Sequence, residues 1–343
     1  MLPNERMALL AQGKLPDRVP FVPTIYEHAA ALIGVTPSAM AQDEKLIVRG
    51  QLDAYRRYGH DLVAVGIDIY NIEAEALGCE VQYFANNTIP SVERHILGGN
   101  KAGLAGLSVP DPESAGRMPL LLEAATAVQR EIGQEVPVAA AIVGPFTLAA
   151  LLRGYEDMVF DLMEDEAYVG RLLDFALEVA ATFGEAMVKR GLGVAVNDSW
   201  ITPPLLSPKY YKSYVLSRHQ ELIRRLKAAG ATSVGLVSGG NTQPIADYLV
   251  QTGSSLLMAD YGLDLAAYKA KAAAAGIILR GSIQASLLQT GSDEDIRAQA
   301  REVLSIGAPG GRFVLGCGVV PFDTEPRRIL LLRELAEACR WQV

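Results

Sequence analysis

Side chains that can take part in chemistry recur along this sequence, and each group of them follows a short run of apolar residues. They comprise carboxylates, phenols, an indole, an imidazole, amides, a hydroxyl and a thiol. The residues are Tyr26, Glu27, His28, Asp68, Tyr70, Glu73, Asn197, Asp198, Trp200, Ser238, Asn241, Asp260, Gln284 and Cys317. Groups of this kind can bind a small molecule, move protons or hold a metal ion. Their pattern predicts an enzyme.

This set contains no lysine and no arginine. A substrate with several carboxylates or phosphates would need bidentate arginine partners. The set therefore favours a neutral or cationic substrate, or a metal ion. One arginine, Arg280, lies inside an apolar run and could point toward the same place.

Several of these residues also have a purely structural interpretation. His28 could pack on a helix, and Asp198 could accept hydrogen bonds at the start of one. His219 lies in the middle of an expected helix, where packing is the commoner role. Cys317 stands between two glycines, so it is either an inert buried side chain or a group that something approaches closely.

The apolar runs predict buried parallel strands, because such strands are covered on both faces and read as continuous hydrophobic stretches. There are eight runs, separated by helical patterns. They cover residues 21–26, 62–68, 136–143, 193–198, 233–238, 255–260, 276–283 and 312–319. Ser207-Pro208, Ser292 and Glu325-Pro326 mark expected helix starts.

Eight alternations of strand and helix predict a (β/α)8 TIM barrel. An open doubly wound sheet would carry a glycine-rich phosphate loop after its first strand, whereas this chain has Glu27-His28-Ala29-Ala30 there. The 343 residues suit one barrel domain over residues 1–343, although length alone also permits two domains. Catalytic groups of such barrels lie at the carboxyl ends of the strands. The candidate side chains named above fall at or just after these ends.

One segment interrupts the alternation, from residue 70 to about residue 111. Residues 79–99 alternate in polarity and contain Asn86-Asn87, which predicts a β-hairpin insertion. A helix over residues 113–132 is expected to follow. If the start of this segment is extended, Glu73 and Glu75 share one face and act together.

Composition limits the possible partners and compartments. The net charge is −8, and no basic run is present, so nucleic acid is not an expected partner. Three widely spaced cysteines favour a reducing cytoplasm. No apolar stretch approaches the roughly 18 residues that a membrane span needs, and the N-terminal residues do not resemble a signal peptide.

Short motifs in a fixed order give the chain a family resemblance. They are Pro16-Asp17-Arg18-Val19-Pro20, Tyr58-Gly59-His60-Asp61, Glu73-Ala74-Glu75-Ala76-Leu77-Gly78, Gly144-Pro145-Phe146-Thr147, Leu206-Ser207-Pro208, Gly239-Gly240-Asn241-Thr242 and Gly316-Cys317-Gly318-Val319. With these motifs the chain resembles the uroporphyrinogen decarboxylase superfamily, and within it the corrinoid-dependent methyltransferase branch.

The decarboxylases of that superfamily carry an Arg-Gln-Ala-Gly-Arg segment near the first strand, where this chain reads Val22 to His28. The thiol-methylating members hold zinc with a His-x-Cys pair after the fifth strand and a cysteine on the eighth. Val237 and Gly239 occupy the positions of that pair, and only Cys317 is kept. A thiol is therefore not the expected methyl acceptor.

The remaining resemblance is to the methyltransferase component of O-demethylases. It implies that methyl passes from a methyl ether, often a methoxylated aromatic, to the Co(I) corrinoid of a partner protein, with the ether oxygen activated by a metal or an acid. It implies zinc held by Asp198 and His219, with Cys317 and Glu185 as further candidate ligands. Asp198, His28 and Tyr26 are the expected catalytic residues. Tyr70, Glu73, Trp200 and Asn241 are the expected substrate-binding residues.

Two other functions stay open at this point. One is a cofactor-independent decarboxylase of the uroporphyrinogen decarboxylase type, with Asp198 or Asp68 as general acid. The other is a barrel that binds a corrinoid protein without catalysing a reaction.

Overall fold

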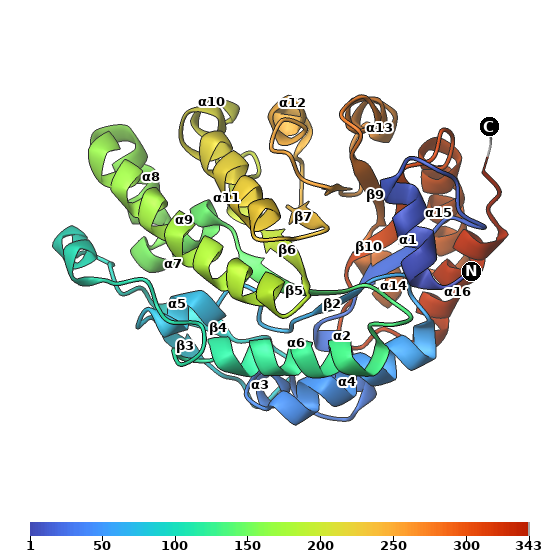
Figure 1. The fold of residues 1–343 in the computed structure, drawn as a ribbon, viewed down its shortest axis with the longest axis horizontal. Helices are drawn as coiled ribbons and strands as arrows, with labels where there is room; N and C mark the ends of the chain where they lie inside the picture. Colours follow the sequence, from blue (N-terminus) through green and yellow to red (C-terminus); the bar gives the residue numbers. More distant parts are fainter. Residues whose placement is uncertain (342–343) are drawn as a thin grey trace.

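The computed structural model describes residues 1–341, which form a barrel of eight parallel strands inside a layer of helices (Figure 1). Each strand lies within one of the eight predicted runs, so the predicted (β/α)8 barrel is confirmed. The strands are β1 (Phe21–Thr24), β2 (Val63–Val65), β5 (Val138–Val143), β6 (Gly193–Asn197), β7 (Val234–Val237), β8 (Leu256–Ala259), β9 (Ile278–Ile283) and β10 (Phe313–Val319).

Helices of very different lengths surround the strands. The α-helices are α1 (Pro3–Ala11), α2 (Glu27–Leu32), α3 (Pro37–Ala41), α4 (Glu44–Tyr58), α5 (Ile72–Ala76), α6 (Met118–Ile132), α7 (Pro145–Arg153), α8 (Tyr155–Glu164), α9 (Glu166–Lys189), α10 (Pro208–Tyr210), α11 (Leu216–Ala228), α12 (Ala246–Leu249), α13 (Leu265–Ala274), α14 (Ala285–Thr290), α15 (Asp293–Gly307) and α16 (Pro326–Ala338). Short 3₁₀ helices are η1 (Lys101–Gly106), η2 (Ser199–Ile201) and η4 (Gln243–Ile245), and η3 (Tyr211–Val215) is a π-helical turn.

The predicted helix starts are confirmed at three places. Ser207 accepts a hydrogen bond from the Tyr210 amide at the start of α10, and Ser292 forms a capping box with Asp295 at the start of α15. Pro326 is the first residue of α16. The predicted helix over residues 113–132 begins later, at Met118, because Gly116 has a φ of +50° that a helix cannot contain.

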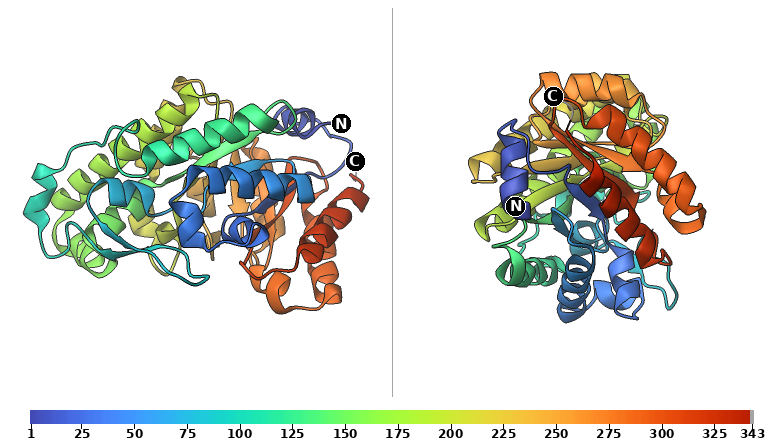
Figure 2. Two further views of the ribbon diagram at one scale, coloured as in Figure 1. Left: turned by 90° about the horizontal axis from the view of Figure 1, so that it is seen from below. Right: turned by 90° about the vertical axis from the view of Figure 1, so that its right-hand side faces the viewer.

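The interruption after β2 contains the short antiparallel strands β3 (Glu80–Gln82) and β4 (Ser91–Arg94). It extends toward the end of the molecule opposite α15 and α16 (Figure 2). Its first part is the helix α5 rather than an extended strand, so the expectation that Glu73 and Glu75 share one face is wrong. Glu73 is buried, whereas Glu75 is partly exposed and pairs with Arg117.

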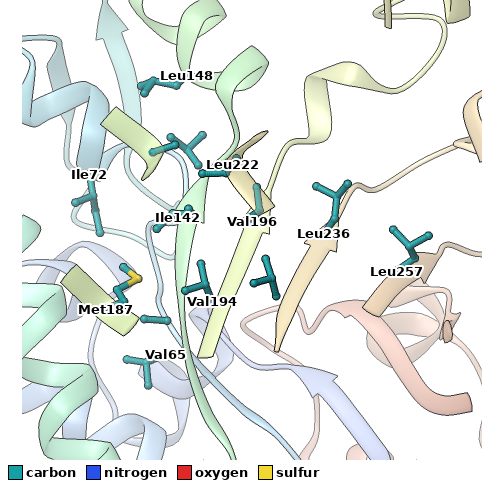
Figure 3. Packing of buried hydrophobic residues seen from close by; sticks show 14 of the residues in the cluster. Val65, Ile72, Ile142, Leu148, Met187, Val194, Val196, Leu222, Leu236 and Leu257 are labelled. Carbon is teal, nitrogen blue, oxygen red and sulfur yellow. The ribbon is translucent and has the colours of Figure 1, made fainter. Parts of the chain in front are cut away.

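The main core lies between the strands and the helices. Val194 and Val196 of β6, Leu236 of β7 and Leu257 of β8 point into this layer, where Leu222 of α11 also lies (Figure 3). Of the alternate residues on these strands, Ala195 of β6 and Gly235 of β7 are small and border the barrel interior, whereas Leu256 of β8 is large. Among the described residues, no helix has the length and apolar character needed to cross a membrane.

The barrel is nearly closed, and Asp61 joins its two ends. The hydrogen-bonded order runs from β1 through β10, β9, β8, β7, β6 and β5 to β2, so β1 and β2 meet at a seam. The Asp61 amide donates to the Phe21 carbonyl at 2.8 Å, and the Asp61 carboxylate accepts from the Phe21 amide at 2.7 Å. The same buried carboxylate pairs with Arg6 and Arg18 at 2.5 and 2.8 Å.

We expect Asp61→Ala to lower the free energy of unfolding by about 3 kcal/mol, because it leaves buried guanidinium groups without their shared partner. Urea denaturation followed by circular dichroism measures this change. Arg301→Ala is the control, since the Arg301–Glu294 pair is exposed and should contribute about 0.5 kcal/mol or less. Equal stability of the two variants would contradict a structural role for the seam.

Candidate functional site

The interior of the barrel contains a cavity of about 250 Å³. TIM barrels are usually filled by layers of branched side chains. Here Ala64, Ala139, Ala195 and Gly235 line the cavity from four different strands, and their small side chains leave space. The cavity also contacts residues that precede the strands, such as Pro137 and Ser233, so it extends from the strand starts toward the carboxyl ends.

Arg280 of β9 points into this cavity, so the strand-end region does contain a cation. Its side chain is 6% exposed, and its stem lies against Gly316 of β10. A Cβ atom at position 316 would be 2.7 Å from the Arg280 Cδ atom, which explains the glycine there. The guanidinium reaches the end of β1, where Nη1 donates to Thr24 Oγ1 at 2.9 Å.

Tyr26 lines the same cavity, two residues after the end of β1. Burial raises the pKa of its hydroxyl, and the nearby Arg280 charge offsets part of that effect. The phenol therefore keeps its proton at neutral pH and acts as a hydrogen-bond donor. Tyr26 packs in one apolar cluster with Ile69 and Ala141, and Tyr70 contacts that cluster.

One other predicted binding residue, Trp200, lies close to Tyr70, whereas Asn241 lies farther out. The Tyr70 hydroxyl is 2.7 Å from Ser199 Oγ, next to Trp200 in the chain. The Trp200 ring packs edge-to-face on Tyr155, with 5.4 Å between ring centroids. Asn241 is exposed, and its side-chain oxygen accepts from the Gln243 amide at 3.2 Å.

Asp198 is the acceptor of a buried hydrogen-bond network behind the cavity. It is fully buried, and Oδ1 accepts from the amide and the hydroxyl of Thr147 at 2.8 and 2.6 Å. Oδ2 accepts from the Phe146 amide and lies 2.8 Å from His219 Nε2. The carboxylate thus satisfies free amides at the N-terminus of α7, as a capping residue does.

Gly144 and the π-turn η3 allow this network to form. A Cβ atom on Gly144 would be 2.3 Å from the Asp198 Cβ atom, so only glycine fits beside the aspartate. Tyr211 in η3 places its hydroxyl 3.1 Å from His219 Nδ1. A π-turn contains an extra residue compared with an α-helical turn. Here the turn carries the Tyr211 side chain, which faces inward together with that of His219. Both nitrogens of His219 therefore have protein partners.

The four predicted metal ligands do not converge. Asp198 and His219 are adjacent, but they are saturated by each other and by Thr147, Phe146 and Tyr211. Glu185 of α9 pairs with Arg225 at 3.0 Å on the outer helical layer. Cys317 lies in the core between strands and helices, and burial raises the pKa of its thiol to about 11.

Within residues 1–341, no group of three or more histidine, cysteine, aspartate or glutamate side chains is placed to hold a metal ion. The residues present therefore do not fit a zinc site of the expected composition, because Asp198, His219, Glu185 and Cys317 are not brought together as one ligand set.

His28 lies outside the cavity wall. It is buried, with Nε2 2.7 Å from the Tyr58 hydroxyl and Nδ1 3.2 Å from the Phe322 carbonyl. Burial lowers the pKa of its imidazole. The geometry connects α2 to α4 and to the loop after β10, which agrees with the packing interpretation of this residue.

A third polar group belongs to the insertion. Arg117 contacts Asp68 at 2.7 Å and also pairs with Glu75. Glu73 is 1% exposed and accepts from the Val143 amide at the end of β5 at 2.7 Å. Burial raises the pKa of the Glu73 carboxyl to about 7. Glu73 thus fastens the insertion to the barrel.

Sequence reasoning missed the residues that support these groups. Thr147 and Tyr211 hold Asp198 and His219, and Arg117 holds Asp68. The Gly144-Pro145-Phe146-Thr147 motif could have indicated Thr147 as a supporting residue. Arg117 stands before a helix with no motif around it, so nothing in its local sequence indicates its partner.

Solved structures share this architecture. A methyltransferase from Methanosarcina mazei superimposes with a TM-score of 0.88 over 98% of both chains, at 23% sequence identity. A B12-independent methionine synthase from Shewanella sp. W3-18-1 superimposes with a TM-score of 0.54, at 12% identity over 87% of this chain and 89% of that chain. These similarities define the class of fold.

The sequence comparison defines the family. The uroporphyrinogen decarboxylase (URO-D) family model matches residues 2–339, so the chain belongs to this family. The methylcobamide:CoM methyltransferase MtbA of Methanosarcina acetivorans is 27% identical over 93% of each chain. MtaA of Methanosarcina barkeri (strain Fusaro), of the same description, is 27% identical over 92% of each. A uroporphyrinogen decarboxylase of Rhodococcus opacus is 26% identical over 98% of this chain and 97% of that protein.

We expect the stability of the Glu73→Gln variant relative to wild type to rise with pH between about 4.5 and 7 and then level off. A buried carboxyl with a raised pKa opposes folding once it must ionise, so wild type loses stability as pH rises toward about 7. Across this pH range, the free energy of unfolding of Glu73→Gln relative to wild type should change by about 3 kcal/mol. Urea denaturation of both proteins across this pH range measures it, and a difference independent of pH would contradict the buried acid.

Proposed function

We propose that this protein transfers a methyl group from a methyl ether, an aryl methyl ether in particular, to the Co(I) corrinoid of a partner protein. Its relatives MtbA and MtaA are named methylcobamide:CoM methyltransferases, which supports methyl transfer that involves a corrinoid. The observation that carries the proposal is the hollow barrel with the Tyr26 phenol in its wall.

The reaction breaks the bond between the methyl carbon and the ether oxygen. The electron pair of that bond stays on oxygen, which becomes a phenoxide, and the electron pair of Co(I) forms the new bond to the methyl carbon. Cobalt in this state is a strong nucleophile that needs no activation by this chain. The protein therefore has to bind the ether, direct its methyl group outward and stabilise the oxygen.

Tyr26 is suited to the last of these tasks. A hydroxyl that stays protonated can donate a hydrogen bond to the ether oxygen, and that bond strengthens as negative charge develops there. The part of the wall formed by Ala64, Ala139 and Val237 is apolar, which increases the strength of a hydrogen bond from this donor. Full protonation of the phenoxide can follow from solvent after release.

The residues of this barrel suit an ether as the substrate better than a thiol. The end of β7 offers Val237 and Gly239 rather than a histidine and a cysteine, and Cys317 lies in the outer core layer. No step of the proposed mechanism uses zinc, because the candidate ligands do not converge. The position of Asp198, His219 and His28 in closed hydrogen-bond networks favours a supporting role for these three residues over direct contact with substrate.

We expect wild type to convert the Co(I) absorbance of a reduced corrinoid protein to that of methylcobalt when methoxylated phenols and benzoates are added. We expect Tyr26→Phe to lower kcat by about 10²- to 10³-fold, as the loss of one transition-state hydrogen-bond donor does. Tyr55→Phe is the matched control, because the Tyr55 hydroxyl contacts Glu135 outside the barrel and activity should be unchanged.

Two results would overturn the proposal. The first is the absence of methylcobalt across the whole panel of ethers with corrinoid proteins. The second is release of carbon dioxide from a carboxylic acid substrate without corrinoid, which would assign the chain to the decarboxylases of its family.

A further inference from the structure

We propose that Arg280 binds a carboxylate group of the methyl donor inside the barrel, so that the substrate is an anionic methyl ether. This inference names the substrate class of the proposed function and rests on it. Arg280 lies outside the family motifs. Its burial, its partners and the space in front of it point to this role.

Arg280 is a buried charge whose contacts are all to neutral groups. Nη1 donates to Thr24 Oγ1 at 2.9 Å, and Nη2 lies 2.7 Å from the Met258 sulfur. Nε has no hydrogen-bond partner among the described residues. A thioether is a weak acceptor, so two of the three guanidinium nitrogens lack a strong partner.

Such a charge is costly without an anion. Removing a charged group from water costs several kcal/mol unless a counter-charge is present, and proteins normally pair buried guanidinium groups. The other buried arginines follow this rule: Arg6 pairs with Asp17 and Asp61, and Arg153 pairs with Asp161. Among residues 1–341, no carboxylate forms an ion pair with Arg280.

The groups near Arg280 do not replace the missing anion. The charge of the Asp260 carboxylate acts on Arg280, but its two oxygens accept from the Gly240 and Tyr261 amides at 2.7 and 2.9 Å. Burial keeps the Cys317 thiol and the Tyr26 phenol in their neutral forms by raising the pKa of each. The positive charge therefore remains available to a ligand.

The cavity in front of Arg280 has room for that ligand. Its volume of about 250 Å³ exceeds the roughly 150 Å³ of an engineered cavity that binds benzene, and it lies just below the usual size range of drug-binding pockets. A single aromatic ring with a carboxylate and a methoxy group fits this scale. The carboxylate would take both Nη2 and Nε in a bidentate pair, with the weak Met258 contact displaced.

The glycine opposite Arg280 leaves room for the extended arginine side chain. Any larger residue at position 316 would collide with the Arg280 stem, since an added Cβ atom lies 2.7 and 2.8 Å from Cδ and Cγ. Gly316 thus keeps the guanidinium extended toward Thr24 and Tyr26. One end of a bound ligand would meet Arg280, and its ether oxygen would then be available to the Tyr26 hydroxyl.

Binding measured without any corrinoid tests this inference. Isothermal titration calorimetry would compare 4-methoxybenzoate with its neutral analogue 4-methoxybenzamide, for wild type, Arg280→Met and Arg280→Lys. We expect wild type to bind the acid about 10- to 100-fold more tightly than the amide, as charge-assisted hydrogen bonds usually allow. Arg280→Met should bind both ligands equally, and Arg280→Lys should keep only part of the preference.

Thermal unfolding of the same variants separates recognition from folding. Arg280→Met should unfold at the same temperature as wild type or higher, because it removes an unpaired buried charge. If Arg280→Met does not fold, Arg280→Lys still tests the preference for the acid. Arg301→Met, at an exposed position on α15, should keep the full preference.

Equal affinity of wild type for acid and amide would overturn the inference, and so would a preference that survives in Arg280→Met. Arg280-dependent binding of inorganic phosphate in place of the aromatic acid would also overturn it. Arg280-dependent binding of the acid with no methyl transfer from any ether would leave the anion site standing and overturn the proposed function. Methyl transfer from neutral ethers alone would support the proposed function and overturn the anion site at Arg280.

Discussion

The buried Asp61 carboxylate carries the seam on which the barrel depends. A ladder of parallel strands can close only if its first and last strands are held together, and β1 and β2 meet here without a continuous ladder. The Asp61 side chain takes the place of the missing ladder, because it binds the backbone of Phe21 and two guanidinium groups at once. Because β1 also carries Thr24 and leads into Tyr26, the seam fixes the wall of the cavity.

Two buried polar groups near the carboxyl ends of the strands, the Asp198 network and Arg280, differ in how completely their hydrogen-bonding capacity is used. Asp198, His219 and Thr147 exhaust one another's hydrogen-bonding capacity, which makes their arrangement rigid and keeps ligands away. Arg280 faces open space with weak neutral partners. The first system holds α7 and α11 in place, and the second is the one that a ligand can complete.

The repeating part of the fold could be predicted from the sequence, because buried parallel strands leave a local apolar signal. All eight runs contain a strand, and Ser207, Ser292 and Pro326 mark helix starts as expected. The site was predicted less well. Candidate residues were placed near strand ends, but the sequence does not tell whether Asp198 faces a cavity or a helix N-terminus. That difference depends on contacts between residues about 50 positions apart, such as Asp198 and Thr147.

The small residues of the barrel wall have a consequence for how this protein can change over evolutionary time. At Gly235 an added methyl group would meet only Leu256, at about ordinary van der Waals distance, and Ala64 and Ala195 also border empty space. A lineage could therefore reshape the chamber one methyl group at a time while the backbone stays in place. The hollow interior makes new substrates accessible through single substitutions.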